Sequence, residues 1–148
     1  MRTLVFLTAL AAAAALALPA SSMSEPSAPS ASTLTAKSSR FGRVLFDGRG
    51  FALYAFTRDP RNRSACYGAC ATAWPPYFAK GQLRAGPGVA RGLLVTTRRR
   101  DGKRQVTYAG RPLYYYVGDR SAGDILCQNV DEFGGLWLVV RPNGKPVR

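Results

Sequence analysis

The side chains best suited to chemistry in this sequence are three cysteines and a recurring set of aromatic and acidic residues. Cys66 and Cys70 lie four positions apart, and Cys127 lies far downstream. In an oxidising compartment, Cys66 and Cys70 most simply form a disulfide. Cys127 then has three alternatives: a buried inert thiol, a bond to Cys66 or Cys70 instead, or a link between two chains. No cofactor is predicted, although three thiolates could bind zinc or copper(I), so the metal content stays open.

The absence of histidine narrows the reactions that the chain can catalyse. Ser-His-Asp and Cys-His machinery both need an imidazole, as do His-ligated metals and c-type haem attachment. No Gly-x-x-x-x-Gly-Lys loop for phosphate is present. The stretch from Asp119 to Glu132 is the best place for a catalytic carboxylate pair or a calcium site. Nearby Arg111 and Arg120 favour plain salt bridges there, so the sequence assigns no catalytic residue and favours a non-catalytic protein.

A Tyr-x-aromatic-x-x-Asp motif occurs twice, within two stretches that match at an offset of 60 residues, Gly50–Asp59 and Gly110–Asp119. Positions two apart on a strand share a face, so each aromatic pair points the same way. The Asp falls just after the strand, where its carboxylate can accept hydrogen bonds from turn amides. A place in the core is the favoured interpretation, and a ligand-binding role is the alternative. The motif residues are Tyr54, Phe56, Asp59, Tyr114, Tyr116 and Asp119.

The duplication extends beyond the motif, because the two tryptophans also recur at similar spacing, as Trp74 and Trp137. Internal similarity of this kind indicates one structural unit used twice, and one such unit is too small to bury its own apolar face. We therefore predict one small domain in which repeats at about 41–80 and 104–142 pack around a shared core with approximate two-fold character.

Each repeat has the pattern of a mainly β structure containing hairpins. Short apolar runs alternate with Gly-containing turns, which is typical of a small sandwich or barrel. The segment from Cys66 to Trp74 favours a short helical turn, which Pro75 and Pro76 end because proline cannot continue a helix.

The first 40 residues differ in composition from the rest. Arg2, an apolar run at 4–18 and small residues up to Ala20 are typical of a cleaved signal peptide over residues 1–20. The apolar run is shorter than the about 20 residues needed to cross a bilayer, so no membrane span is expected in the mature chain. A Ser/Ala/Pro-rich stretch at 21–40 is predicted to be a disordered linker. The duplicated domain is then expected at 41–148, in a secreted or periplasmic protein.

Positive charge dominates the composition, with 21 Lys and Arg against 8 Asp and Glu. Such an excess favours anionic partners, and for an exported protein these are envelope polymers or lipid headgroups rather than nucleic acid. An Asp-Gly pair at 101–102 predicts a hairpin turn that places a basic cluster on an exposed tip. The alternative is that the charge only keeps the protein soluble. The candidate partner-binding residues are Arg98, Arg99, Arg100, Lys103 and Arg104.

Taken together, the motifs at Gly50–Asp59, Cys66–Pro76, Gly110–Asp119 and Gly134–Val140 resemble the secreted-repeat family of predicted lipoproteins with a Yx(F/W/Y)xxD motif. The match covers about residues 41–140. The resemblance implies export and a duplicated β architecture, and it implies no reaction. The sequence departs from the lipoprotein pattern because no Cys lies at the signal exit, and because Cys127 stands where a glycine-like residue is expected.

Two hypotheses for function follow from the sequence. The favoured one is an exported, non-catalytic binding or structural module of the cell envelope with a basic surface suited to anionic partners. The other is a redox or metal-handling periplasmic protein that uses its three cysteines and the motif tyrosines. The ligand, the disulfide pairing and the oligomeric state are not determined by the sequence.

Overall fold

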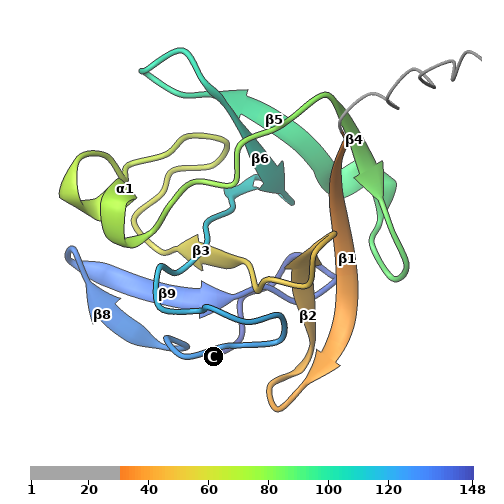
Figure 1. Cartoon of the computed structure of the whole chain (residues 1–148). Helices are drawn as coiled ribbons and strands as arrows, with labels where there is room; N and C mark the ends of the chain where they lie inside the picture. Colours follow the sequence, from red (N-terminus) through yellow and green to blue (C-terminus); the bar gives the residue numbers. More distant parts are fainter. Residues whose placement is uncertain (1–30) are drawn as a thin grey trace, which may run out of the picture.

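This computed structural model describes residues 31–148 and consists of short strands connected by tight turns and long loops (Figure 1). The predicted signal peptide at 1–20 and the first part of the predicted linker, 21–30, lie outside the described residues. In chain order the elements are β1 (Ala31–Ser39), β2 (Gly42–Asp47), β3 (Tyr54–Phe56), α1 (Ala69–Ala73), β4 (Gln82–Ala85), the 3-10 helix η1 (Arg91–Leu93), β5 (Leu94–Arg98), β6 (Arg104–Tyr108), β7 (Arg111–Pro112), β8 (Val130–Glu132) and β9 (Gly135–Val139).

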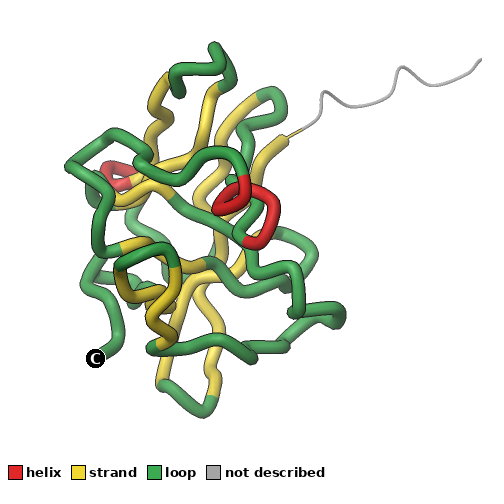
Figure 2. The backbone as a smooth tube through the Cα atoms, turned by 90° about the vertical axis from the view of Figure 1, so that its left-hand side faces the viewer, coloured by secondary structure: helices red, strands yellow, loops and turns green. Residues whose placement is uncertain are grey.

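Among the described residues, the strands form three small sheets, ordered β2-β1-β4, β5-β6-β7 and β3-β9-β8. All neighbouring strands in these sheets are antiparallel except β1 and β4. The tube view shows the strands surrounded by long loops, with the five-residue helix α1 at the surface (Figure 2). The predictions of a mainly β domain, and of a short helical turn before Trp74, are confirmed.

The linker predicted up to residue 40 is wrong for Ala31–Ser39, because these residues form β1. β1 lies between β2 and β4 and is the central strand of its sheet. Its alternate side chains Ser32, Leu34 and Ala36 are buried, with exposed fractions of 5%, 0% and 6%. This alternation is typical of a half-buried strand, but small Ser, Thr and Ala side chains make it resemble a low-complexity linker.

The two repeats exchange their tryptophan-bearing segments. The segment after Trp137, in the second repeat, pairs with the first repeat, since β9 is antiparallel to β3 and Leu45 N–H donates to Val140 O at 2.9 Å. The segment after Trp74, in the first repeat, pairs in the same way with the second repeat, since Val106 N–H donates to Tyr77 O at 2.8 Å. Each repeat therefore supplies backbone hydrogen bonds to the other, which gives a physical reason why the two fold together.

A pseudo-two-fold axis passes between Tyr54 and Tyr114, the first residues of the two motifs. Each donates its backbone N–H to the carbonyl of the other at 2.9 Å, forming a symmetric antiparallel bridge. Two clusters of buried apolar side chains lie around this bridge and include residues of both repeats. The prediction of one domain with a shared core is consistent with this arrangement.

Candidate functional site

The motif tyrosines and aspartates bind one another across the two repeats. The Tyr54 hydroxyl donates to Asp119 Oδ2 at 2.7 Å, and the Tyr114 hydroxyl donates to Asp59 Oδ2 at 2.7 Å. Both tyrosines are fully buried. Each repeat thus supplies a donor to the other repeat and an acceptor for it, which makes the motif a reciprocal connection between the repeats.

Each motif aspartate also organises the loop that follows it. Asp59 Oδ1 accepts the backbone N–H of Ala65 at 2.7 Å, and Asp119 Oδ1 accepts that of Leu126 at 2.9 Å. Each carboxylate therefore joins the following loop to the other repeat. Asp59 follows the end of β3, whereas Asp119 follows an isolated bridge at Tyr114 rather than the predicted strand. Both lie in a turn, since Asp59 N–H donates to Phe56 O at 3.1 Å and Asp119 N–H donates to Tyr116 O at 3.2 Å.

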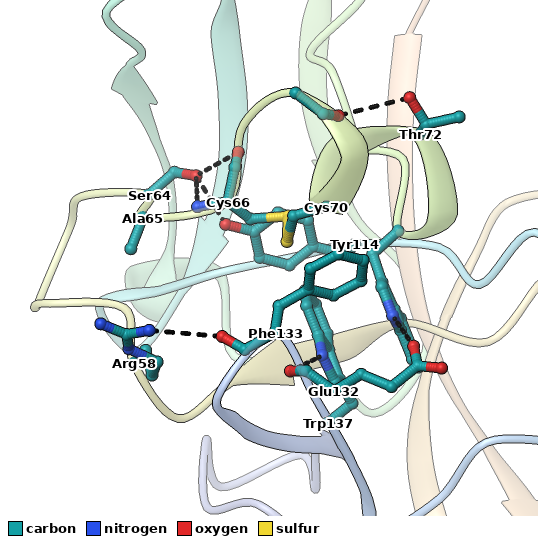
Figure 3. The surroundings of a disulfide bond; sticks show 12 residues. Arg58, Ser64, Ala65, Cys66, Cys70, Thr72, Tyr114, Glu132, Phe133 and Trp137 are labelled. Atoms are coloured by element: carbon teal, nitrogen blue, oxygen red, sulfur yellow. Dashed lines mark hydrogen bonds between the residues drawn. A yellow bond between two sulfur atoms is a disulfide. The ribbon is translucent and has the colours of Figure 1, made fainter.

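The second aromatic residue of each motif belongs to a ladder of four rings in the core. Phe56 stacks on Trp137 at a centroid distance of 4.2 Å, Trp137 stacks on Trp74 at 4.1 Å, and Trp74 contacts Tyr116 at 4.7 Å. The pseudo-two-fold axis passes between the tryptophans. Glu132 binds both tryptophans of the ladder (Figure 3). Its carboxylate accepts Trp74 Nε1–H at 2.8 Å, and its backbone carbonyl accepts Trp137 Nε1–H at 3.2 Å.

Burial changes the titration of these groups. It raises the pKa of Tyr54 and Tyr114 above the usual range, and their neighbouring carboxylates raise it further. Burial also raises the pKa of Asp59 from 3.8 to about 6, against the opposing effects of Ala65 N–H, Tyr114 and Arg99. The folded state therefore holds this proton more tightly than the unfolded chain. Its contribution to stability is complete below about pH 4 and is lost as the pH rises through 6.

The comparisons with known proteins agree with this duplicated arrangement. A family model described as a secreted repeat of unknown function matches residues 35–77 and 95–141. The chain belongs to this secreted-repeat family. No curated protein and no solved structure matches the chain. The resemblance drawn from the motifs is thereby confirmed, and the first match begins inside β1, earlier than the repeat boundary predicted from sequence.

In this secreted-repeat domain, Cys66 and Cys70 form a disulfide with a Cα–Cα distance of 5.3 Å, as predicted (Figure 3). It connects the loop after Asp59 to α1. Cys127 is a free, half-buried thiol. Burial raises its pKa, while its hydrogen bond to Tyr116 acts in the opposite direction. Its bonding to Cys66 or Cys70 is excluded by their pairing with each other, whereas a link between two chains stays a prediction.

Arg99 corrects the prediction that the whole basic cluster lies on an exposed tip. Its side chain is buried, with 5% of the residue exposed. Its Nη1 donates to Ser64 Oγ and Gln105 Oε1, both at 2.7 Å, and its Nη2 donates to Cys66 O at 2.7 Å. Arg99 therefore connects the β5–β6 hairpin to the disulfide loop, and it is not available to a partner.

The other four residues of the cluster are exposed, as predicted, and we call them the basic hairpin: Arg98, Arg100, Lys103 and Arg104. Arg98 and Arg104 lie directly opposite one another in the register of β5 and β6. Arg100 lies over the ring of Tyr67 at 4.1 Å, and Lys103 lies over that of Phe78 at 5.1 Å. The hairpin therefore presents several cations beside two aromatic rings.

The carboxylates of the secreted-repeat domain are mostly bound by neutral donors. In the part of the chain that the structure describes, only Asp47 and Asp101 form ion pairs. The salt bridges expected for Arg111 and Arg120 are not among them. Instead, Asp124 accepts two backbone N–H groups, while Asp119 and Glu132 accept a tyrosine hydroxyl and an indole N–H. Most basic side chains are thus left without a carboxylate partner.

The stretch suggested for a carboxylate or calcium site gives no cluster of ligands. Within residues 31–148, no three Cys, Asp or Glu side chains come together as a metal site would require. The described helices include none that is long and apolar enough to cross a bilayer.

Proposed function

We propose that this secreted-repeat protein is an exported, non-catalytic binding module that attaches to an anionic polymer of the cell envelope through its basic hairpin. The observation that carries the proposal is the pairing of the charges. Basic residues outnumber acidic ones by 21 to 8 in the sequence, and among the described residues only Asp47 and Asp101 form ion pairs. Most basic side chains therefore have no carboxylate partner, and the excess positive charge attracts polyanions.

The geometry of the hairpin supports an anionic ligand. Arg98 and Arg104 face one another across two strands, and like charges in directly opposed positions destabilise a sheet. An anion placed between the two guanidinium groups would relieve that repulsion with charge-assisted hydrogen bonds. Tyr67 holds Arg100 in place through two contacts. The centre of the Tyr67 ring lies 4.1 Å from the Arg100 guanidinium carbon, and the Tyr67 hydroxyl accepts the Arg100 backbone N–H at 3.1 Å.

The described residues provide less support for the redox or metal-handling alternative. Two of the three thiols form the disulfide, and the motif tyrosines are hydrogen-bonded within the core. Export to the envelope rests on the family's description as secreted and on the predicted signal peptide.

The test measures binding of the mature chain to polygalacturonate, a long carboxylated polysaccharide, across a salt series, with dextran as the neutral comparison. We expect binding that weakens as salt rises, because exposed charges are screened within about 10 Å at 0.1 M salt. The variant Arg100→Glu/Lys103→Glu should lose most of the affinity. The matched control Arg120→Glu/Lys145→Glu changes the net charge equally and should bind much better than the hairpin variant. If both variants lost the same affinity, binding would depend on net charge alone and not on the basic hairpin. Equal binding of polygalacturonate and dextran would refute the proposal.

A further inference from the structure

Beside the basic hairpin lies a hollow of about 570 Å³ that the motif does not use. Three segments distant in sequence form it: the start of β1, the turn after β2, and the segment that follows Trp74. Tyr115, from the second repeat, completes the wall. A concave site with apolar walls and a few polar groups is typical of small-ligand binding, and this volume lies in the usual range.

The walls offer flat apolar surfaces that are not completely covered. Pro75, Phe78 and Tyr115 are all half-buried. Tyr115 is held in place because its hydroxyl donates to Asp47 Oδ2 at 2.9 Å, and Tyr77 is held by its bond to Thr33 O at 2.9 Å. The walls are therefore positioned before any ligand arrives, which reduces the ordering cost of binding.

Two exposed cations lie at the rim of the hollow. Arg49 keeps 71% of its side chain exposed, and its Nε lies 2.9 Å from Asp47 Oδ2. Its guanidinium carbon lies 5.1 Å from the centre of the Phe51 ring and 5.8 Å from that of Tyr115, so the group is held beside the wall of the hollow. Lys80 is also exposed, and its hydrogen bonds with Ser32 use its backbone rather than its ammonium group. Asp47 lies below them with a side chain only 4% exposed. It already accepts two backbone N–H groups. The hollow therefore has two cations at its rim against one carboxylate, and the hydrogen-bonding positions of that carboxylate are already occupied.

The hollow is continuous with the basic hairpin. Phe78 lines the hollow, and Lys103 Nζ of the hairpin lies 5.1 Å from the centre of its ring. The backbone connects them as well, since Ala79 N–H donates to Arg104 O at 2.9 Å. A chain-like ligand bound along the hairpin would thus have an adjacent recess in which one end or one unit could be bound.

We infer that this hollow is a recognition subsite for an acidic oligosaccharide, with a sugar ring packed on Tyr115, Phe78 and Pro75 and its carboxylate bound by Arg49 and Lys80. The inference rests on the proposed function and specifies its ligand. A pyranose presents apolar C–H faces that can cover aromatic and proline surfaces, and a carboxylate fits the guanidinium fork. A polyphosphate has the charge but no apolar face to cover these walls.

The test titrates the isotope-labelled mature chain with trigalacturonate and follows backbone amide signals by NMR, with maltotriose as the neutral comparison. We expect trigalacturonate to shift the signals of residues around the hollow, and maltotriose to bind much more weakly. The variant Arg49→Ala/Lys80→Ala removes both rim cations and should weaken trigalacturonate binding about tenfold or more. The control Arg120→Ala/Lys145→Ala removes two cations elsewhere and should change it little.

The outcomes separate this inference from the proposed function. Shifts confined to the basic hairpin, equal binding of maltotriose, or equal affinity in the rim variant would each overturn the subsite. If polygalacturonate still bound with dependence on Arg100 and Lys103, the proposed function would stand without it. If neither the polymer nor the trisaccharide bound, both proposals would be wrong. An unchanged amide spectrum of the free rim variant excludes misfolding as the cause of any loss.

Discussion

Replacing Tyr54 with Phe should show that the motif holds the two repeats together. The change removes one oxygen and leaves the ring, which packs edge-on against Trp74 at 5.2 Å. The lost hydrogen bond is 2.7 Å long, fully buried at the tyrosine, and ends on Asp119, which is 6% exposed. A bond of this kind to a charged acceptor contributes about 1.5–3 kcal/mol. Asp119 keeps its bond from Leu126 N–H, so we expect a loss of about 2 kcal/mol.

The assay is urea unfolding followed by tryptophan fluorescence, since Trp74 and Trp137 are completely buried and become exposed on unfolding. Asp119→Ala and the double variant complete a cycle with Tyr54→Phe, and the coupling between the two sites should also be about 2 kcal/mol. Tyr67→Phe is the control, because its hydroxyl contacts an exposed backbone N–H and should contribute little. A Tyr54→Phe cost below about 0.5 kcal/mol, or a coupling near zero, would refute the proposed connection between the repeats.

Three further changes test other parts of the structure. Asp59→Asn removes a carboxyl whose pKa is raised to about 6. The loss of stability expected in the parent between pH 4 and 6 should therefore shrink, by up to about 3 kcal/mol, in unfolding curves measured across that range. An unchanged pH profile would contradict the raised pKa. Cys66→Ser/Cys70→Ser opens a very short loop and should cost about 2 kcal/mol in unfolding curves. In the unfolded parent chain, an alkylating reagent should label Cys127 alone before reduction and all three cysteines after it. Arg99→Ala removes three buried hydrogen bonds and leaves Gln105 Oε1 without its donor, so it should cost about 3 kcal/mol or more. Arg100→Ala should change stability by less than about 0.5 kcal/mol and lower polymer affinity, and similar effects of the two variants on stability would show that Arg99 is not the buried connection described above.

Local pattern was sufficient to predict most of the elements. The Asp101-Gly102 pair marks the turn between β5 and β6, and the proline pair after Trp74 follows the end of α1 closely. Each of these signals depends on backbone preferences within a few residues, which the sequence states directly. The duplicated motif likewise indicated a shared core, because the same residue types recur in the same order.

The missed features all depend on contacts between distant segments. The strand β1 is hydrogen-bonded between β2 and β4 and packs Leu34 and Ala36 into a core cluster, and the small side chains of Ser32 and Ala36 carry little apolar signal of their own. Arg99 belongs to a run of three arginines, and only the disulfide loop that folds over it distinguishes it from its neighbours. The exchange of tryptophan segments between the repeats is also invisible in sequence, because either partner strand has the same local pattern.

The role of the motif has a consequence for where function lies in this protein. Its tyrosines and aspartates complete one another across the pseudo-two-fold axis, and its second aromatic residues stack on the central tryptophans. Residues engaged in this way specify the duplicated fold, so sharing the motif indicates a shared architecture rather than a shared ligand. Under the proposed function, ligand choice would depend on side chains that the fold leaves exposed. In this chain the clearest such groups are the cations of the basic hairpin and of the adjoining rim, Arg49 and Lys80, which lie outside both motifs.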